Sequence, residues 1–428
     1  MKINIDPYQL IDLAKKYGTP CYLYSKAKII ENYEAYQTTF DSYNSKYLIC
    51  YAVKASSNLA LLNILNDLGS GFDIVSLGEL KRVQQVSKDC SKVVFSGVGK
   101  QDFEIKEALD AGILCFNVES EAELFLINSI AEQYNKKAPI SFRINPNIDA
   151  KSHPYISTGL TEHKFGIDIT RADYFYNLAS NLKNINILGL DCHIGSQITD
   201  TKPLAAACVA VKNLFERLHN NNIKISHINM GGGLGIDYDV SSFLANRDKS
   251  SAIPDQKIWV DTIMQNLEVT SDTKVIIEPG RSIIAKAGIL LTKVIYNKSN
   301  ALDQHSFTII DAGMNDLLRP ALYHSKHKII NLSDNFNLDT FNTLSPNISI
   351  VGPVCESSDT FSKNSNLSTK PGDILAILDA GAYGFVMSSN YNSRPRAAEV
   401  LLDENNNDFL IKPRENLEDL YSNETIIH

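Results

Sequence analysis

The stretch YLICYAVKASSNLALLNILNDLGSGFDIVS, residues 47–76, holds the pattern that decides the fold. Two short runs of β-branched and apolar residues, YLICYAVKA (47–55) and GFDIVS (71–76), flank the segment LALLNILNDLG. In that segment apolar residues recur at i, i+3 and i+4, which is the spacing of one helix face. A strand, a helix and a second strand in this order form the repeating unit of a parallel sheet.

The same alternation continues from this stretch to about residue 280. Amphipathic segments such as LGELKRVQQVSK and AVKNLFERLH separate six further strand candidates. These candidates are KVVFSG (92–97), LCFNVE (114–119), ISFRIN (140–145), ILGLDCHIG (187–195), ISHINMGGG (225–233) and KVIIEPG (274–280). Eight strands with helical intervals predict a (β/α)8 TIM barrel in preference to an open doubly wound sheet.

Beyond residue 281 the pattern changes to short apolar runs with turn residues and few helical segments, among them FTIIDAG, ISIVGPVCES and DILAILDAGAYG. We therefore expect the barrel over 31–280 and a C-terminal all-β domain over 281–428. The N-terminal segment 1–30 is expected to join the β domain through the strand CYLYS (21–25). The stretch 148–164 is an irregular insertion, and loops of that length are often functional.

Composition narrows the classes of function. The formal net charge of −8 does not indicate a nucleic-acid partner. The N-terminus has no apolar stretch of signal-peptide type, and Lys286 and Lys293 interrupt the most apolar later stretch, so we expect no membrane span. Seven cysteines are scattered without a CxxC pair, which argues against a disulfide framework or a zinc site. We expect a reduced, cytoplasmic protein without a metal.

Polar residues gather where the predicted strands end, at Lys54, His193, the glycines 231–233 and Glu278. Barrel enzymes build their active sites at the C-terminal ends of the strands. Lys54 follows an apolar run, so it either reaches water from the strand end or lies in a partly desolvated site. A lysine in a partly desolvated site can form a Schiff base with an aldehyde.

Two motifs near the later strand ends fit an anionic ligand. The glycine-rich MGGGLG (230–235) is either a tight strand-to-helix turn or a loop that lets backbone N–H groups approach a phosphate. EPGR (278–281) places a carboxylate and an arginine around Pro-Gly. Glu278 could hold a proton on a pyridine nitrogen and Arg281 a carboxylate in a bidentate fork, or the two could form a structural ion pair.

Two further residues have both a structural and a chemical interpretation. His193, in DCHIGSQ, could be a structural histidine, but the glycine and serine that follow it are typical of a ligand surface. Cys355, in GPVCESSD, could be an inert buried thiol, yet the acidic residues at 356 and 359 are unusual neighbours for one.

Together these motifs resemble the fold-type III group of pyridoxal-phosphate enzymes, the alanine racemase-like barrel, and within it the diaminopimelate decarboxylase family. The resemblance covers nearly the whole chain. Its motifs, in order, are YAVKAS, GFDIVSLGEL, FRINPN, HPYISTGLTEHKFGI, HIGSQI, MGGGLGI, EPGRSI, DAGMNDLLRPALY, GPVCESSD and DAGAYG. It implies a pyridoxal 5′-phosphate cofactor and the conversion of meso-2,6-diaminopimelate to L-lysine and CO2, the last step of lysine biosynthesis.

The resemblance also implies roles for single residues. Lys54 would hold the cofactor as a Schiff base, His193 would stack on its ring, and Glu278 would pair with the pyridine nitrogen. Residues implied to hold the cofactor phosphate are Ser196, Gly232, Gly233, Gly235, Gly280, Arg281 and Tyr383. Cys355 would donate a proton across the interface of a homodimer with shared active sites. The HPYIST segment would lie over the site.

The implied substrate contacts decide between related enzymes. Those contacts are Arg281, Arg319, Tyr323, Glu356 and Tyr383. Decarboxylases of ornithine or arginine tend to carry an Asp after the cysteine, suited to a lone distal ammonium, whereas this chain has a glutamate there. The glutamate would receive the distal ammonium of diaminopimelate and the two arginines its distal carboxylate.

Two alternatives remain open at this point. One is another basic amino-acid decarboxylase, of the ornithine, arginine or carboxynorspermidine type. The other is a catalytically inactive homologue that acts as a binding protein. Such a homologue should have lost the lysine at 54 or the cysteine at 355, and this chain has both.

Overall fold

The computed structural model describes residues 6–43, 45–149, 164–238, 253–268, 272–299, 305–333 and 348–428. It divides into two compact units. The described residues of 30–236 and 252–283 form one of them, here called the barrel unit. Those of 1–29, 237–251 and 284–428 form the other, the sheet unit. The insertion expected at 148–164, with its HPYIST segment, lies almost wholly outside the described residues.

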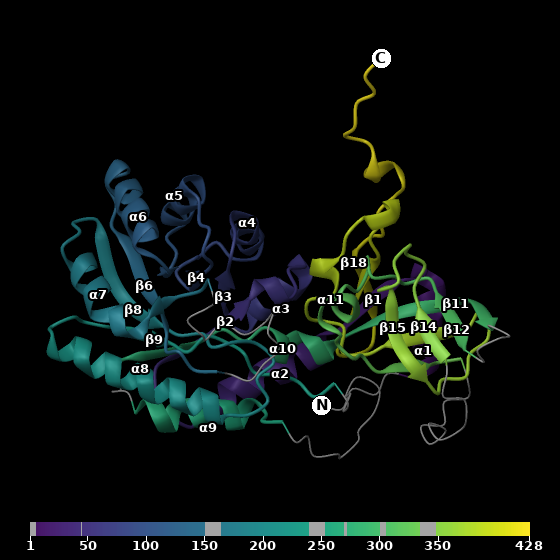
Figure 1. Ribbon diagram of the computed structural model, residues 1–428, viewed down its shortest axis with the longest axis horizontal. Coiled ribbons are helices and arrows are strands. Elements are labelled where there is room, and N and C mark those ends of the chain that lie inside the picture. The colour runs from purple at the N-terminus through teal and green to yellow at the C-terminus, as the bar shows by residue number, and fades with distance from the viewer. Residues whose placement is uncertain are drawn as a thin grey trace. The chain divides into compact units, whose positions relative to one another are not determined.

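Eight parallel strands close the barrel of the barrel unit (Figure 1). Each strand pairs with the next one along the chain, and the last strand pairs with the first. The strands are β2 (Tyr47–Ala52), β3 (Gly71–Ile74), β4 (Val93–Phe95), β5 (Cys115–Val118), β6 (Ala138–Asn145), β8 (Ile185–Asp191), β9 (His227–Asn229) and β10 (Lys274–Ile277). Each overlaps one of the predicted apolar runs, so the predicted barrel is confirmed. A two-residue strand, β7 (Ile167–Asp168), pairs with β6.

Helices alternate with these strands and surround the barrel in Figure 1. They are α2 (Lys26–Asp41), α3 (Leu59–Asp67), α4 (Leu77–Val86), α5 (Asp102–Ala111), α6 (Glu121–Gln133), α7 (Ala172–Ser180), α8 (Lys202–Asn220), α9 (Gln256–Leu267) and α10 (Arg281–Ile284). Local sequence fixes several of their starts. The side chains of Ser76 and Ser120 accept hydrogen bonds from the backbone N–H groups of Glu79 and Glu123, satisfying donors that the first helical turn leaves unpaired.

A buried apolar cluster lies inside the barrel. Leu48, Cys50, Val94, Cys115 and Ile276 pack together, although β5 and β10 are not neighbours in the sheet. Side chains from such strands can meet only across the interior. This packing fills the barrel and leaves the polar residues at the carboxyl ends of the strands to form a site.

The sheet unit is built mainly from antiparallel strands around one long strand, β11 (Gly288–Ser299). The first half of β11 pairs with β1 (Cys21–Ser25) and with β16, while its second half pairs with β12. β1 also pairs with β17 in parallel. The remaining elements are α1 (Pro7–Tyr17), β12 (Ser306–Ile310), α11 (Arg319–Tyr323), β13 (Ile329–Asn331), β14 (Ile348–Val351), β15 (Thr360–Ser365), β16 (Ile374–Ile377), β17 (Ala398–Leu402) and β18 (Asp408–Lys412).

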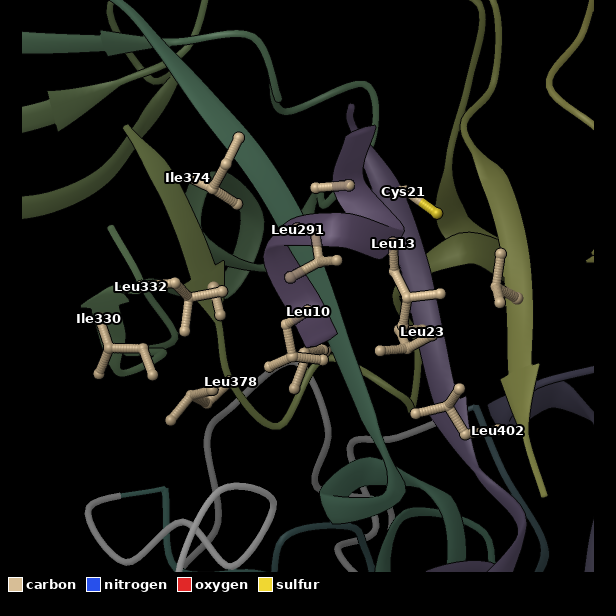
Figure 2. Close-up of a cluster of buried hydrophobic side chains, with 14 of the residues drawn as sticks. Leu10, Leu13, Cys21, Leu23, Leu291, Ile330, Leu332, Ile374, Leu378 and Leu402 are labelled. Carbon is tan, nitrogen blue, oxygen red and sulfur yellow. The ribbon is translucent and has the colours of Figure 1, made fainter. Parts of the chain in front are cut away.

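Helix α1 supplies part of the core of the sheet unit. Its side chains Leu10 and Leu13 pack against Leu23 of β1 and Leu291 of β11, as Figure 2 shows. The predicted all-β domain is therefore mostly sheet, with a helix at the start of the chain that its composition did not reveal. Within the described residues, no helix is both long and apolar enough to cross a bilayer.

Candidate active site

Lys54 lies just past the carboxyl end of β2, in a short 3-10 turn. We expected a strand over residues 47–55, but β2 ends at Ala52 and the turn Val53–Ala55 follows. The backbone N–H of Ala52, the last residue of β2, donates to the carbonyl of Pro279, just after β10 (3.1 Å). The ammonium of Lys54 then lies 2.6 Å from Oδ2 of Asp73, near the end of β3. Lys54 is therefore in an ion pair and is not a lysine simply solvated by water.

Glu278 follows β10 directly and is held by amide side chains from two other strands. Its Oε1 accepts from Nδ2 of Asn229 at 2.6 Å and from Nδ2 of Asn117 at 3.4 Å. Burial, together with the charges of Asp73 and Asp191, raises the pKa of this carboxyl well above its usual range. A carboxyl whose pKa is raised holds its proton more readily and is suited to share one with a basic ring nitrogen.

Further charged groups surround these residues at the same end of the barrel. Burial raises the pKa of Asp191, the last residue of β8, to about 7, although the positive charge of Arg143 opposes the shift. Arg143 of β6 donates to Glu119, which follows β5, at 3.2 Å. Each of these three side chains is less than a tenth exposed. The barrel end thus carries two buried carboxyl groups and a buried guanidinium, and Arg143 and Glu119 form an ion pair there.

His193 is neutral and its tautomer is fixed by the glycine loop. The backbone N–H of Gly232 donates to its Nδ1 at 3.1 Å, so Nδ1 is the acceptor and Nε2 carries the proton. Burial, with the nearby positive charges of Arg143 and Lys54, holds the pKa of His193 well below its usual range. A neutral imidazole at this position can lie flat against an aromatic ring.

The glycine loop after β9 packs its backbone against two other strand ends. A side-chain Cβ at Gly232 would lie 2.2 Å from the carbonyl oxygen of Glu278, and one at Gly233 would lie 2.5 Å from that of Gly195. Residues 231–238 are not helical, and the next helix, α9, begins only at Gln256. The interpretation of MGGGLG as a tight strand-to-helix turn is therefore wrong. The loop instead pairs with the segment after His193, where the N–H of Gly235 donates to Ile198.

This packing refines the predicted role of the glycines. The N–H groups of Gly232 and Gly235 donate to His193 Nδ1 and to the carbonyl of Ile198, so these contacts bring the loop backbone close to the segment after β8. The side chains supply donors beside them, because Arg281 Nη2 lies 3.1 Å from Ser196 Oγ. Gly280 packs against Ala55, in the turn that carries Lys54.

The sheet unit holds the remaining predicted residues. Cys355 lies in the turn after β14 and is exposed, whereas the other six cysteines are buried. Its interpretation as an inert buried thiol is therefore wrong. The backbone N–H of Cys355 donates to Asn392 Oδ1 at 3.0 Å, and the exposed Glu356 accepts from the hydroxyl of Tyr391 at 2.6 Å. The buried carboxylate of Asp359 holds the same turn by accepting from two backbone N–H groups.

Arg319, Tyr323 and Tyr383 also belong to the sheet unit. Arg319 begins α11 and is buried, and its guanidinium lies over the ring of Tyr323, 5.8 Å from the ring centre. Tyr383 has a φ of +55°, a left-handed conformation that non-glycine residues adopt at a cost. Such a residue marks a tight turn held by its surroundings, here the segment after β16.

The sequence did not reveal several residues of these clusters. Asp73 lies in GFDIVS and Arg143 in FRINPN, and a charged residue inside an apolar run was the available signal for both. Asn229 and Tyr238 carry no such signal. Only the fold brings Asn229 to Glu278 and Tyr238 to Arg319.

The barrel residues fit a pyridoxal phosphate. Within the described residues, Oδ1 of Asp73 and Oδ1 of Asp191 are buried and lack a hydrogen-bond partner, which is typical of a site that binds a polar ligand. The barrel end holds a lysine that can react with an aldehyde, a buried carboxyl whose pKa is raised, and a histidine whose pKa is lowered. Among all the residues that the structure describes, no group of three or more His, Cys, Asp or Glu side chains is placed to hold a metal ion.

The fold and the site define a parallel barrel with a lysine, a buried carboxyl and a histidine gathered at the carboxyl ends of its strands, and comparisons with known proteins give its family. Residues 26–285 match the model of the pyridoxal-dependent decarboxylases, pyridoxal binding domain. The diaminopimelate decarboxylases of Vibrio cholerae and Haemophilus influenzae are 48% and 45% identical, over 98% and 100% of this chain and 95% and 98% of their own.

A solved structure extends the likeness to three dimensions. The diaminopimelate decarboxylase of Helicobacter pylori, complexed with L-lysine, superposes with a TM-score of 0.88 at 42% identity, over 96% of this chain and 98% of that one. The chain therefore belongs to the pyridoxal-dependent decarboxylases and, within them, to the diaminopimelate decarboxylase family. It is a carboxy-lyase.

Proposed function

We propose that the protein removes CO2 from meso-2,6-diaminopimelate to give L-lysine, using pyridoxal 5′-phosphate bound at the carboxyl end of the barrel. The observation that carries this proposal is the joint placement of Lys54 and Glu278 after neighbouring strands, β2 and β10. One supplies an amine for an aldehyde and the other a protonated carboxyl for a ring nitrogen. The names of the full-length relatives favour this reaction over decarboxylation of ornithine, arginine or carboxynorspermidine.

The residues that would hold the cofactor divide by chemistry. Lys54 would bind its aldehyde, Glu278 would hold a proton at its ring nitrogen, and His193 would lie on its ring. Bound pyridoxal phosphate supplies an electron sink for the electron pair that CO2 leaves behind. The phosphate would be held by residues that donate or approach closely: Ser196, Gly232, Gly233, Gly235, Gly280, Arg281 and Tyr383.

The residues that would hold the substrate match the groups at its distal end. Glu356 would receive the distal ammonium, while Arg281 and Arg319 would bind the distal carboxylate. Tyr323 and Tyr383 would complete this part of the site. An aspartate at position 356 would reach less far, and so the glutamate favours diaminopimelate over substrates with a lone distal ammonium.

We further propose that Cys355 donates the proton that replaces CO2, and that it acts in the site of a second subunit of a homodimer. The exposure of its thiol supports this, because a group that completes another subunit's site must lie at the surface of its own. Seven unpaired cysteines support a location in the reducing cytoplasm. For the domain boundaries we propose a cofactor-binding barrel over 31–280, with 1–30 and 281–428 forming the β domain.

An absorbance spectrum with and without meso-diaminopimelate tests the proposed function. Protein supplied with pyridoxal phosphate should absorb near the edge of the visible range, and substrate should change that band while L-lysine and CO2 appear. Borohydride should fix the cofactor on Lys54, as peptide mass spectrometry would show. An adduct on another lysine would refute the assignment. Turnover of ornithine or arginine in preference to diaminopimelate would favour the alternative enzymes, and cofactor binding without turnover of any of these substrates would favour an inactive homologue.

A further inference from the structure

We propose that Tyr238 is a positioning residue for Arg319 and thereby helps the enzyme to select substrates with a distal carboxylate. The inference rests on the proposed function, in which Arg319 binds that carboxylate. Tyr238 follows the glycine loop and belongs to the sheet unit, as Arg319 does. Neither the motifs nor the resemblance pointed to this tyrosine.

The contact between the two residues is both polar and aromatic. Arg319 Nη2 lies 3.2 Å from the hydroxyl oxygen of Tyr238, so the guanidinium donates and the hydroxyl accepts. The centre of the guanidinium also lies 5.7 Å from the ring centre of Tyr238 and 5.8 Å from that of Tyr323. Arg319 itself is buried, at 5% exposure. Its planar head is therefore in contact with two tyrosine rings and is tethered to one of their hydroxyls.

These contacts orient the guanidinium. The hydroxyl and the ring faces are themselves uncharged, so the tether to Tyr238 holds the cation in place without a carboxylate of its own. A bidentate bond to a carboxylate requires the planar fork in a defined orientation. The hydroxyl of Tyr238 provides that orientation, because it fixes one of the two terminal nitrogens.

Tyr238 is in turn held by His327. The two rings meet edge to face, with centres 5.2 Å apart and planes at 74°. His327 Nδ1 lies 2.9 Å from the carbonyl oxygen of Leu378, which can only accept, so Nδ1 carries the proton. Leu378 lies in the segment that carries Tyr383. The ring of Tyr238 is therefore positioned by a histidine that is itself anchored on the backbone of Leu378.

The chemistry of the proposed reaction offers a ligand pair that tests this arrangement. Decarboxylation of the D centre of meso-diaminopimelate leaves the L centre intact, and L-lysine keeps its ammonium and carboxylate there. The diamine 1,5-diaminopentane has the same chain and both amines but no carboxylate. A loss confined to carboxylate recognition must weaken binding of L-lysine and spare the diamine.

The experiment measures inhibition constants of L-lysine and 1,5-diaminopentane, with kcat and KM for meso-diaminopimelate, in the cofactor-loaded enzyme. Tyr238→Ala should raise the L-lysine constant and KM about tenfold, with kcat and the diamine constant within about twofold of wild type. Tyr238→Phe keeps the ring and loses the hydroxyl, so it should raise the L-lysine constant by only about threefold. Tyr296→Ala, which removes a tyrosine of β11 that is 65% exposed, is the matched control and should change neither constant.

Arg319→Ala separates failure of this inference from failure of the proposed site. If Arg319→Ala weakens L-lysine selectively and Tyr238→Ala does not, Tyr238 has no positioning role and the proposed function stands. Equal losses for both ligands in Tyr238→Ala would show a general structural defect and would also overturn the inference. If Arg319→Ala leaves the inhibition constant of L-lysine unchanged, Arg319 does not bind the distal carboxylate. The inference about Tyr238 is then overturned as well.

Discussion

Lys54 Nζ lies 2.6 Å from Asp73 Oδ2, and the two side chains are unequally exposed, at 38% for the lysine and 0% for the aspartate. The aspartate is fully dehydrated, and its second oxygen, Oδ1, has no hydrogen-bond partner among the described residues. Its charge therefore depends on the lysine, whereas the lysine can reach water. This asymmetry affects every variant in which the lysine is removed.

We predict that Lys54→Ala destabilises the barrel in protein without cofactor. The change leaves a buried carboxylate without its counter-charge, which should cost about 2–3 kcal/mol of unfolding free energy. The double variant Lys54→Ala/Asp73→Asn removes that charge and should recover most of the loss. Denaturant titrations of the two variants against wild type measure this. Equal stability of the single and double variants would mean that the pair contributes nothing to the fold.

A second prediction concerns His227, which lies inside the barrel on β9. Its Nε2 is 3.8 Å from the Cys115 sulfur of β5, and burial lowers its pKa to about 4. In the unfolded chain His227 takes up a proton near pH 6.5, whereas in the folded protein it does so only near pH 4. Acid therefore favours unfolding. The stability linked to His227 is complete above pH 6.5 and is lost as the pH falls towards 4. The loss should reach about 3 kcal/mol at pH 4 and about 2 kcal/mol at pH 5.

The variant His227→Gln isolates this effect, because glutamine cannot take up the proton. The difference in unfolding free energy between pH 8 and pH 5 should be about 2 kcal/mol smaller in the variant than in wild type. His219→Gln, which removes an exposed histidine of α8, is the matched control and should follow wild type. An unchanged pH dependence in His227→Gln would show that His227 is not the group concerned.

The barrel could be predicted from the sequence because its signal is local. Each parallel strand is buried on both faces, so each appears as a short apolar run, and helices with one apolar face separate them. The residues that end those runs, Lys54, His193 and Glu278, could be selected for the same reason. Chemistry at the ends of buried strands stands out against an apolar background.

The residues that hold these groups could not be predicted, because their partners lie far away in sequence. Asn229 meets Glu278, and Tyr238 meets Arg319, only after the strands and turns between them have folded. The 3-10 turn that ends β2 before Lys54 was missed for a similar reason. At that point the backbone of Ala52 bonds to Pro279, more than 200 residues along the chain, and no local pattern encodes that contact.

A third prediction tests whether Glu356 contacts the substrate. Glu356→Ala should lower kcat/KM for meso-diaminopimelate by an amount equivalent to about 2–5 kcal/mol, as expected when a dehydrated charge contact loses one partner. Tyr391→Phe removes only the hydroxyl that donates to Glu356 and should lower kcat/KM far less than Glu356→Ala does. An unchanged kcat/KM in Glu356→Ala would exclude this residue from the substrate site.

The last prediction tests the shared active site of the proposed homodimer. Lys54→Ala and Cys355→Ala should each be nearly inactive alone. Once their subunits exchange, each heterodimer should contain one site with both changes and one intact site, since each subunit of a two-fold dimer contributes the same surfaces. Random pairing makes half of the dimers mixed, so activity should return to roughly a quarter of the wild-type value.

Two measurements make this complementation decisive. The single variants are assayed first, since an active Cys355→Ala protein would show directly that the thiol is not catalytic. Native mass spectrometry then confirms that mixed dimers have formed. Mixed dimers without recovered activity would mean that each site is built within one chain. Because Lys54→Ala leaves the carboxylate of Asp73 without its partner, the mixture should also be prepared with Lys54→Ala/Asp73→Asn, which should complement Cys355→Ala to the same extent.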